Sequence, residues 1–231
     1  MEAGKLREKL LRVEEQIEAA RRRAGRSDAV GIIAVTKTHP VSTVEAALSL
    51  GLDRIGENRV QELEAKVEAI GRDRAEWHLI GHLQRNKVRR ALPLFDVIHS
   101  IDSLRLAREL SAEAERAGVD VVGLVQVNTS GEASKYGFGA AEAVDAVAEV
   151  VSLPRLRVRG LMTMAPYTSE EATLRRTFAG ARRLFERCAE EVPGFEPVHL
   201  SMGMSNDFEI AVEEGSTLVR LGTVLFGERG T

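Results

Sequence analysis

The chain has almost no cysteine: Cys188 is the only one in 231 residues. A single cysteine excludes an intramolecular disulfide and a zinc site built from several cysteines. Cys188 follows Phe178, Ala181 and Leu184 at helical spacing, which predicts a packed core thiol rather than a reactive one. The five histidines do not cluster at ligand spacing, so no metal site is expected.

Long apolar runs and an excess of one charge are also missing. No apolar segment approaches the roughly 20 residues of a membrane span, and the charged N-terminus does not resemble a signal peptide. The formal net charge is −3, with acidic and basic residues interspersed, unlike the basic face of a nucleic-acid-binding protein. We therefore expect a cytoplasmic protein that binds neither nucleic acid nor membranes.

Aromatic residues make up only 4% of the chain, and Tyr136 and Tyr167 are its two tyrosines. They are therefore the only candidates for a phenolic acid or base, and neither has a sequence context that supports such a role.

A regular alternation of strand and helix patterns is what the chain does have. A long amphipathic first helix, ending near Gly25, precedes eight short apolar segments that are typical of buried strands, with helical patterns between them. The expected strands are 31–37, 54–56, 76–81, 96–101, 120–128, 155–162, 197–200 and 217–221.

This alternation predicts a single α/β domain over residues 1–231, folded as a closed (β/α)8 TIM-type barrel with an extra N-terminal helix. No linker rich in proline, glycine or serine divides the chain. An open, doubly wound sheet is the alternative, although its Gly-x-Gly-x-x-Gly fingerprint is missing after the first strand.

Active sites of such barrels lie in the loops at the carboxyl ends of the strands, and Lys37 ends the first strand. A charged amine is costly beside a buried apolar run unless it is paired or functional. A desolvated lysine amine is a nucleophile toward aldehydes. The alternative is a lysine whose head group simply reaches water, and Lys135 is the other lysine expected in a loop.

The loops after the seventh and eighth strands together predict a phosphate site. Residues 201–205 (SMGMS) follow the seventh strand, with Ser205 as the expected N-cap of the next helix, and Gly222 follows Arg220 at the end of the eighth. Backbone N–H groups and small hydroxyls at these two loops often bind phosphate in barrels. The alternative is two glycine turns and a capping serine.

Three further positions have simple structural explanations beside a functional one. Asn58 could cap the following helix, His82 could be a loop histidine without a task, and Met162 could be a packing residue.

A lysine after the first strand and a phosphate site after the seventh and eighth resemble the layout of fold-type III pyridoxal 5′-phosphate (PLP) proteins. The chain resembles the YggS/PROSC family of pyridoxal phosphate homeostasis proteins, a family with an alanine racemase N-terminal-domain-like barrel. Matching motifs are AVTK (34–37), GENRVQE (56–62), WHLIGHLQRNK (77–87), HSID (99–102), SKYG (134–137), RGLMTM (159–164), LSMGMSND (200–207) and GSTLVRLGTVLFG (215–227).

The resemblance implies PLP as cofactor, held as an internal aldimine on Lys37. It implies an arginine at the pyridine nitrogen, Arg220, with Asn58 and Met162 as neighbours of the ring. Around the phosphate it implies Ser201, Met204, Ser205, Gly222 and Thr223. No residue is assigned a catalytic role, and His82 and Tyr136 occupy positions that vary in the family.

Two functions follow from the resemblance. The first is a carrier that buffers intracellular PLP or delivers it to PLP-dependent apo-enzymes as transient clients, and it requires no dedicated catalytic activity. The second is a weak amino-acid racemase. Fold-type III racemases add a β-domain that supplies a catalytic tyrosine, whereas here the barrel is expected to use the whole chain. We therefore expect a monomeric carrier; a third possibility is a phosphate-binding barrel enzyme without PLP.

Overall fold

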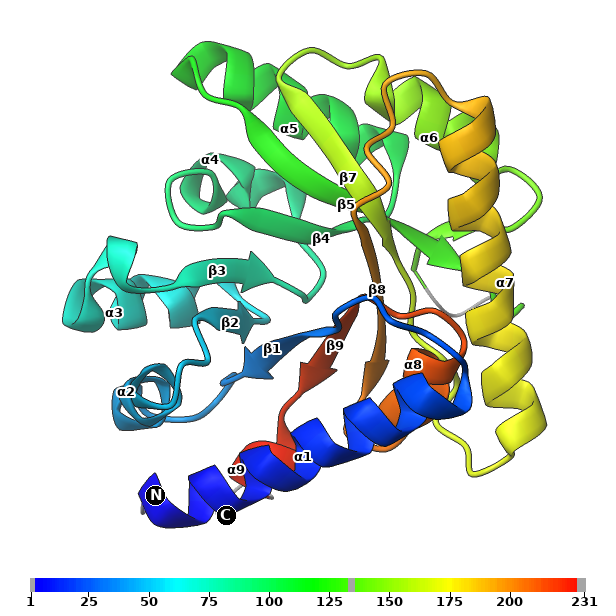
Figure 1. The fold of residues 1–231 in the computed structure, drawn as a ribbon. Coiled ribbons are helices and arrows are strands. Elements are labelled where there is room, and N and C mark those ends of the chain that lie inside the picture. The colour runs from blue at the N-terminus through cyan, green and yellow to red at the C-terminus, as the bar shows by residue number, and fades with distance from the viewer. Residues whose placement is uncertain (1–2, 133–135, 228–231) are drawn as a thin grey trace.

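A computed structural model describes residues 3–132 and 136–227. In this part of the chain, eight parallel strands form a closed barrel with helices outside it (Figure 1). The barrel strands are β1 Gly31–Val35, β2 Arg54–Glu57, β3 Glu76–Leu79, β4 Val97–Ile101, β5 Val121–Asn128, β7 Leu156–Met162, β8 His199–Met204 and β9 Leu218–Leu221.

Pairing of β4 with β5 closes the barrel, with Val97 opposite Val122. On the other side, β1 pairs with both β2 and β9, and Ile33 lies opposite Arg220. A doubly wound sheet would leave two strand edges open, so this closure excludes it. The predicted TIM-type barrel is confirmed.

Helices follow the strands and cover the outside of the barrel (Figure 1). Their bounds are α1 Ala3–Arg23, α2 Val41–Ser49, α3 Val60–Ile70, α4 Val88–Ala91, α5 Leu104–Ala117, α6 Ala143–Val151, α7 Glu171–Glu191, α8 Phe208–Glu213 and α9 Thr223–Phe226, with 3-10 turns η1 Arg72–Arg74 and η2 Arg85–Lys87. The short strand β6 Phe138–Gly139 pairs with the end of β5. Neither β6 nor α9 was predicted, because a periodicity cannot be recognised over two to four residues.

The extra N-terminal helix is confirmed as α1, which packs against α8 and α9 (Figure 1). Its buried face carries Leu6, Leu10, Val13 and Ile17, spaced three or four residues apart. Helix α9 is short, and α1 covers the adjoining part of the barrel wall. On α7, Cys188 is fully buried, and burial raises the pKa of its thiol to about 11. The predicted core thiol is confirmed.

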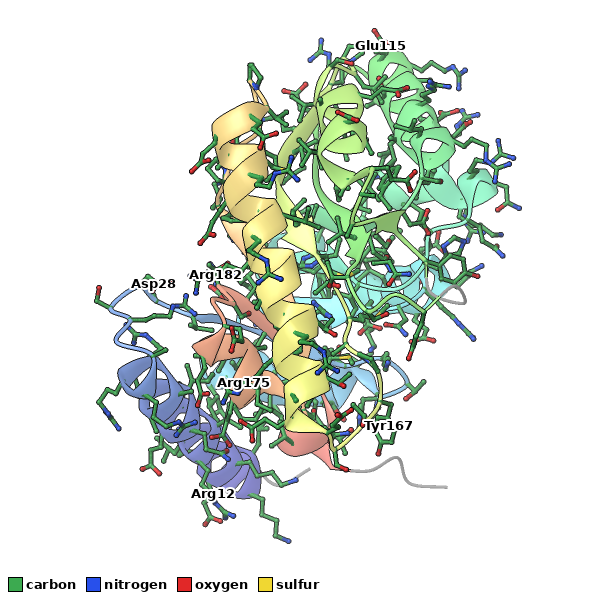
Figure 2. The ribbon with its side chains drawn as sticks, turned by 90° about the vertical axis from the view of Figure 1, so that its right-hand side faces the viewer. Arg12, Asp28, Glu115, Tyr167, Arg175 and Arg182 are labelled. Atoms are coloured by element: carbon green, nitrogen blue, oxygen red, sulfur yellow. The ribbon has the colours of Figure 1, made fainter. Side chains whose placement is uncertain are left out.

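Ion pairs around Glu213 connect α1, α7 and α8. Arg23 at the end of α1 lies 2.5 Å from Glu213 and 3.0 Å from Glu209. Arg175 of α7 lies 2.6 Å from Glu213 and 3.0 Å from Glu214 (Figure 2). Single exposed ion pairs contribute little, but a carboxylate shared by two arginines joins three helices. The loop before α8 contains Ser205, so this cluster supports one side of the barrel mouth.

Candidate functional site

The carboxyl ends of the parallel strands bring the predicted site residues to one rim of the barrel. These residues come from five separate parts of the chain. Lys37 follows β1, Asn58 follows β2, Met162 ends β7, Ser201 and Met204 lie in β8 with Ser205 behind them, Arg220 lies in β9, and Gly222 and Thr223 follow it.

The turn that carries Lys37 is tied to α3 on both sides. Before it, the Thr36 carbonyl accepts a hydrogen bond of 2.7 Å from Lys66 Nζ. After it, the backbone N–H of Thr38 donates to Glu62 Oε2 at 3.1 Å. Thr38 has φ 64°, an unusual value for a β-branched residue, and such strain is concentrated at functional sites. Lys37 itself is half-buried.

A buried polar cluster lies directly beneath this turn. Lys66 Nζ is 2.5 Å from Glu57 Oε1, which also accepts the Thr36 hydroxyl at 2.5 Å. Glu57 is fully buried, and burial raises the pKa of its carboxyl despite the opposing effect of Lys66. The cluster joins the ends of β1 and β2 and so fixes the spacing of Lys37 and Asn58.

Arg220 is a buried cation inside the barrel. Its guanidinium donates from Nη1 to Ser201 Oγ at 2.7 Å and from Nη2 to the Thr163 carbonyl at 2.9 Å. Burial lowers the pKa of Arg220 to about 10, against the opposing effect of Asp207. The guanidinium therefore stays protonated at neutral pH, and it has five N–H donors, more than these two bonds use.

The loops after β8 and β9 are held together by Ser205. Its hydroxyl oxygen accepts from the backbone N–H groups of Gly222 and Val224, both at 3.3 Å. The prediction that Ser205 caps the next helix is wrong: α8 begins at Phe208, and the Ser205 hydroxyl is used between the loops instead. Gly203 has φ 93°, and a Cβ there would lie 2.6 Å from Ala211 Cβ, so this loop requires glycine.

Asn58 does not cap the helix after it, since α3 begins at Val60 behind Arg59. The loop after β3 approaches Asn58 closely: a Cβ on Gly81 would lie 2.5 Å from the Asn58 carbonyl oxygen. A cavity of about 690 Å³ opens beside Asn58, between the start of α3 and this loop. Met162, in contrast, is fully buried and packs against Val97 and Leu124 inside the barrel.

His82 is not an isolated loop residue. Its Nδ1 lies 2.7 Å from Asp102 Oδ2, and its ring stacks on Tyr136 with centroids 4.4 Å apart. These three residues follow β3, β4 and β5, so they form a neighbouring part of the same rim. Tyr167 is 94% exposed at the surface near the start of α7 (Figure 2). Lys135 lies outside the described residues.

A protein-family model described as "Alanine racemase, N-terminal domain" matches residues 9–230. A relative from Aquifex aeolicus (strain VF5), named "Pyridoxal phosphate homeostasis protein", is 40% identical over 223 residues, which are 96% of this chain and 97% of the relative. The chain belongs to the pyridoxal phosphate homeostasis protein family. The predicted resemblance is therefore confirmed.

Solved structures agree with this family and with the fold. PipY of Synechococcus elongatus, solved with PLP bound, is similar with a TM-score of 0.81 and 36% identity, covering 92% of this chain and 100% of that one. An alanine racemase from Clostridium difficile has a TM-score of 0.78 at 15% identity, and the match covers 99% of this chain and 60% of that one. At that identity the likeness shows only that the racemase barrel has the same fold.

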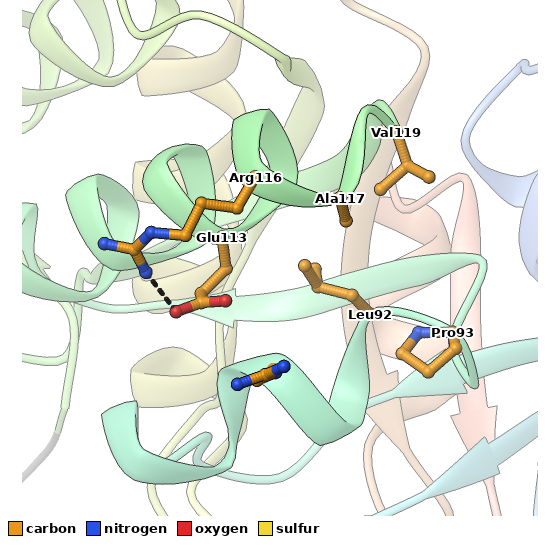
Figure 3. Close-up of a pocket in the computed structure, with 7 residues that line it drawn as sticks. Leu92, Pro93, Glu113, Arg116, Ala117 and Val119 are labelled. Atoms are coloured by element: carbon orange, nitrogen blue, oxygen red, sulfur yellow. Dashed lines mark hydrogen bonds and ion pairs between the residues drawn. The ribbon is translucent and has the colours of Figure 1, made fainter.

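Another hollow of this family member lies away from the barrel mouth. It has a volume of about 570 Å³ and lies between the ends of α4 and α5, next to Leu92 and Val119, with Arg116 paired to Glu113 beside it (Figure 3). These residues precede β4 and β5, so the hollow is at the opposite rim from Lys37.

Within the described ranges, no three His, Cys, Asp or Glu side chains are grouped to hold a metal ion. No helix there has the length and apolar character needed to cross a membrane.

A group of buried histidines inside the barrel was not predicted from the sequence. His78 of β3 and His99 of β4 are at most 1% exposed, and their Nδ1 and Nε2 atoms lie 2.8 Å apart. Burial lowers the pKa of His99 well below its ordinary range, and burial together with Arg159 and Arg54 lowers that of His199 to about 4. The fold therefore keeps the imidazoles of His99 and His199 uncharged at neutral pH.

We expect these histidines to make the protein less stable in acid. Between about pH 6.5 and pH 4, the unfolded chain binds protons on His99 and His199 that the folded chain does not bind. The free energy of unfolding should therefore fall as the pH drops through this window. Urea unfolding of the wild type and of His199→Asn at several pH values measures the effect. The variant should show a shallower dependence, and equal slopes would contradict the expectation.

Proposed function

We propose that this chain binds PLP as a Schiff base on Lys37 and serves in intracellular PLP homeostasis by buffering the cofactor or delivering it. The observation that carries the proposal is the joint placement of Lys37, the buried Arg220 and the loop pair joined by Ser205 on one barrel rim. Family membership and the PLP-bound structure of PipY support the choice of cofactor.

We assign the predicted residues to parts of the cofactor. Ser205 and Gly222 would face the phosphate, together with Ser201, Met204 and Thr223. The hydrogen bonds between the two loops support this, because they hold backbone N–H groups and a small hydroxyl together. Asn58 would lie near the ring, with Met162 as a further neighbour.

Arg220 supports a carrier rather than a dedicated enzyme. Bound PLP supplies an electron sink when its pyridine nitrogen is protonated. Arg220 is protonated at neutral pH and has donors left for that nitrogen, so it would keep the nitrogen unprotonated. Such a site holds the cofactor without strongly promoting carbanion chemistry. We further propose a monomer in the cytoplasm with apo-enzymes as transient clients, and a single domain over residues 1–231.

Reductive labelling tests the proposal. The purified protein is loaded with PLP, its visible spectrum is recorded before and after borohydride, and the labelled peptide is mapped by mass spectrometry. We expect the label on the peptide that contains Lys37. Absence of a visible Schiff-base band, or a label on Lys135 instead, would reject the proposal.

Single-enantiomer amino acids distinguish the carrier from the racemase. The loaded protein is incubated with L- or D-alanine, and the product is resolved by chiral chromatography. We expect turnover far below that of ordinary enzymes. Turnover of roughly 1–1000 per second would establish the racemase instead.

A further inference from the structure

A line of polar side chains runs through the barrel interior from Arg220 to the opposite rim. Arg220 Nη1 lies 2.7 Å from Ser201 Oγ, and Ser201 Oγ lies 3.1 Å from His99 Nδ1. His99 Nε2 then lies 2.8 Å from His78 Nδ1. Each of these four side chains is at most 4% exposed. A buried polar network of this kind is costly unless every member is satisfied.

Burial of Ser201 favours one direction of hydrogen bonding at the Arg220 end of the line. A guanidinium only donates, so Ser201 Oγ accepts from Arg220. Ser201 is fully buried, and among the described residues His99 Nδ1 is the acceptor within reach of its hydroxyl proton, so satisfying that proton requires a bare Nδ1. The proton of neutral His99 therefore sits on Nε2 and is donated to His78 Nδ1, which leaves the His78 proton on Nε2.

The other end of the line agrees with this direction. His78 Nε2 faces Glu76 Oε1 at 3.6 Å, and Glu76 also pairs with Arg54 at 3.0 Å. The interaction with His78, followed by that with Arg54, lowers the pKa of Glu76 to about 2. An ionised carboxylate only accepts. At 3.6 Å the contact is beyond hydrogen-bond distance, and His78 Nε2 has no hydrogen-bond partner among the described residues. The charged group that this nitrogen faces is nevertheless an acceptor, which agrees with a proton on His78 Nε2 and with the orientation that the Ser201 end favours.

The surroundings of His99 oppose a second proton on its ring. Burial has the largest effect, and the positive charge of Arg220 adds to it. A proton on Nδ1 would also point at Ser201 Oγ, which would leave the Ser201 hydroxyl proton without this acceptor. Protonation of His99 would therefore remove the hydrogen bond that sets the direction of the Ser201 hydroxyl beside Arg220.

We propose that His99 and His78, as neutral Nε2–H tautomers, are positioning residues for Arg220. By accepting the Ser201 proton, His99 directs the Ser201 hydroxyl so that its lone pairs face the guanidinium, which fixes the cation inside the barrel mouth. The effect on PLP rests on the proposed function, whereas the tautomers are a property of the chain without cofactor.

The tautomers are tested in the wild-type protein without PLP. Long-range ¹H–¹⁵N correlation spectra of histidine-labelled protein separate Nδ1–H, Nε2–H and charged rings. We expect His99 and His78 as neutral Nε2–H forms at neutral pH. A proton on His99 Nδ1, or a charged His99 ring, would overturn the proposal whether or not the protein binds PLP.

The effect on the cofactor is tested with variants of β4. His99→Leu removes the acceptor for the Ser201 proton, and we expect it to weaken PLP binding by about tenfold and to shift the visible absorption of the bound cofactor. His99→Gln keeps an acceptor and should recover most of both. Ser100→Ala, a buried neighbour outside the line, is the control for packing defects and should leave both unchanged. Equal losses in all three variants would show that His99 matters only for packing. Tautomers as expected, in a protein that binds no PLP, would reject the proposed function but not the positioning of Arg220.

Discussion

Replacing Lys37 by alanine is expected to abolish the borohydride-stable label and to weaken PLP binding by at least about tenfold, which corresponds to ~1.4 kcal/mol. The amine is the only group at this rim that we assign to a covalent bond with the cofactor. Without it, PLP would be held only by its phosphate and ring contacts. Absorption spectra and equilibrium dialysis with PLP measure both effects.

Lys87→Ala is the matched control, because Lys87 lines the cavity beside Asn58 at the same rim. It removes a lysine from the mouth without touching the turn after β1. We expect its spectrum and PLP affinity to match the wild type. Labelling that persists in Lys37→Ala but disappears in Lys87→Ala would show that Lys87, and not Lys37, forms the Schiff base.

The barrel could be predicted from sequence because its strands are buried on both faces and read as apolar runs. All five residues of β4, for example, are buried. The strand ends were less predictable: β1 ends at Val35 rather than at Lys37, which lies in the turn before α2. Ser205 shows the same limit, because a serine before a helix pattern gives no sign that its hydroxyl will bridge two loops.

Partners across the barrel could not be predicted at all. Periodicity indicates which face of a helix or strand is buried, but it does not indicate which side chains of other strands contact that face. Ser201 and His99 are 102 residues apart in sequence and still share a hydrogen bond. The sequence does place His78 and His99 within apolar strands. That position predicts that each side chain is buried, but it does not predict which residue it bonds to.

Lys66 could have been recognised more directly. Leu63, Lys66, Val67 and Ile70 follow the spacing of one helix face, so the apolar stripe of α3 already contains a charge. A lysine on such a stripe needs a buried partner. The partner, Glu57, ends β2, and no pattern in the sequence connects it with Lys66.

Lys66→Met is expected to destabilise the protein by about 3–5 kcal/mol, because it leaves Glu57 as a buried carboxylate without its cation. Glu57 Oε2 already has no hydrogen-bond partner among the described residues, so the Thr36 hydroxyl alone cannot compensate. Urea unfolding measures the loss. Arg7→Met, at an exposed position of α1, should change stability by less than about 0.5 kcal/mol.

A double variant separates the lost ion pair from a packing defect. Adding Glu57→Leu to Lys66→Met removes the unpaired charge, and replacing a buried pair by apolar side chains is often neutral. We expect the double variant to recover most of the loss.

Burial already raises the pKa of Glu57, and without Lys66 the folded state should favour the protonated carboxyl further. The deficit of Lys66→Met should therefore be smaller at about pH 5 than at about pH 8. A deficit that is independent of pH and persists in the double variant would mean that Lys66 supports the Lys37 turn mainly through its hydrogen bond to the Thr36 carbonyl.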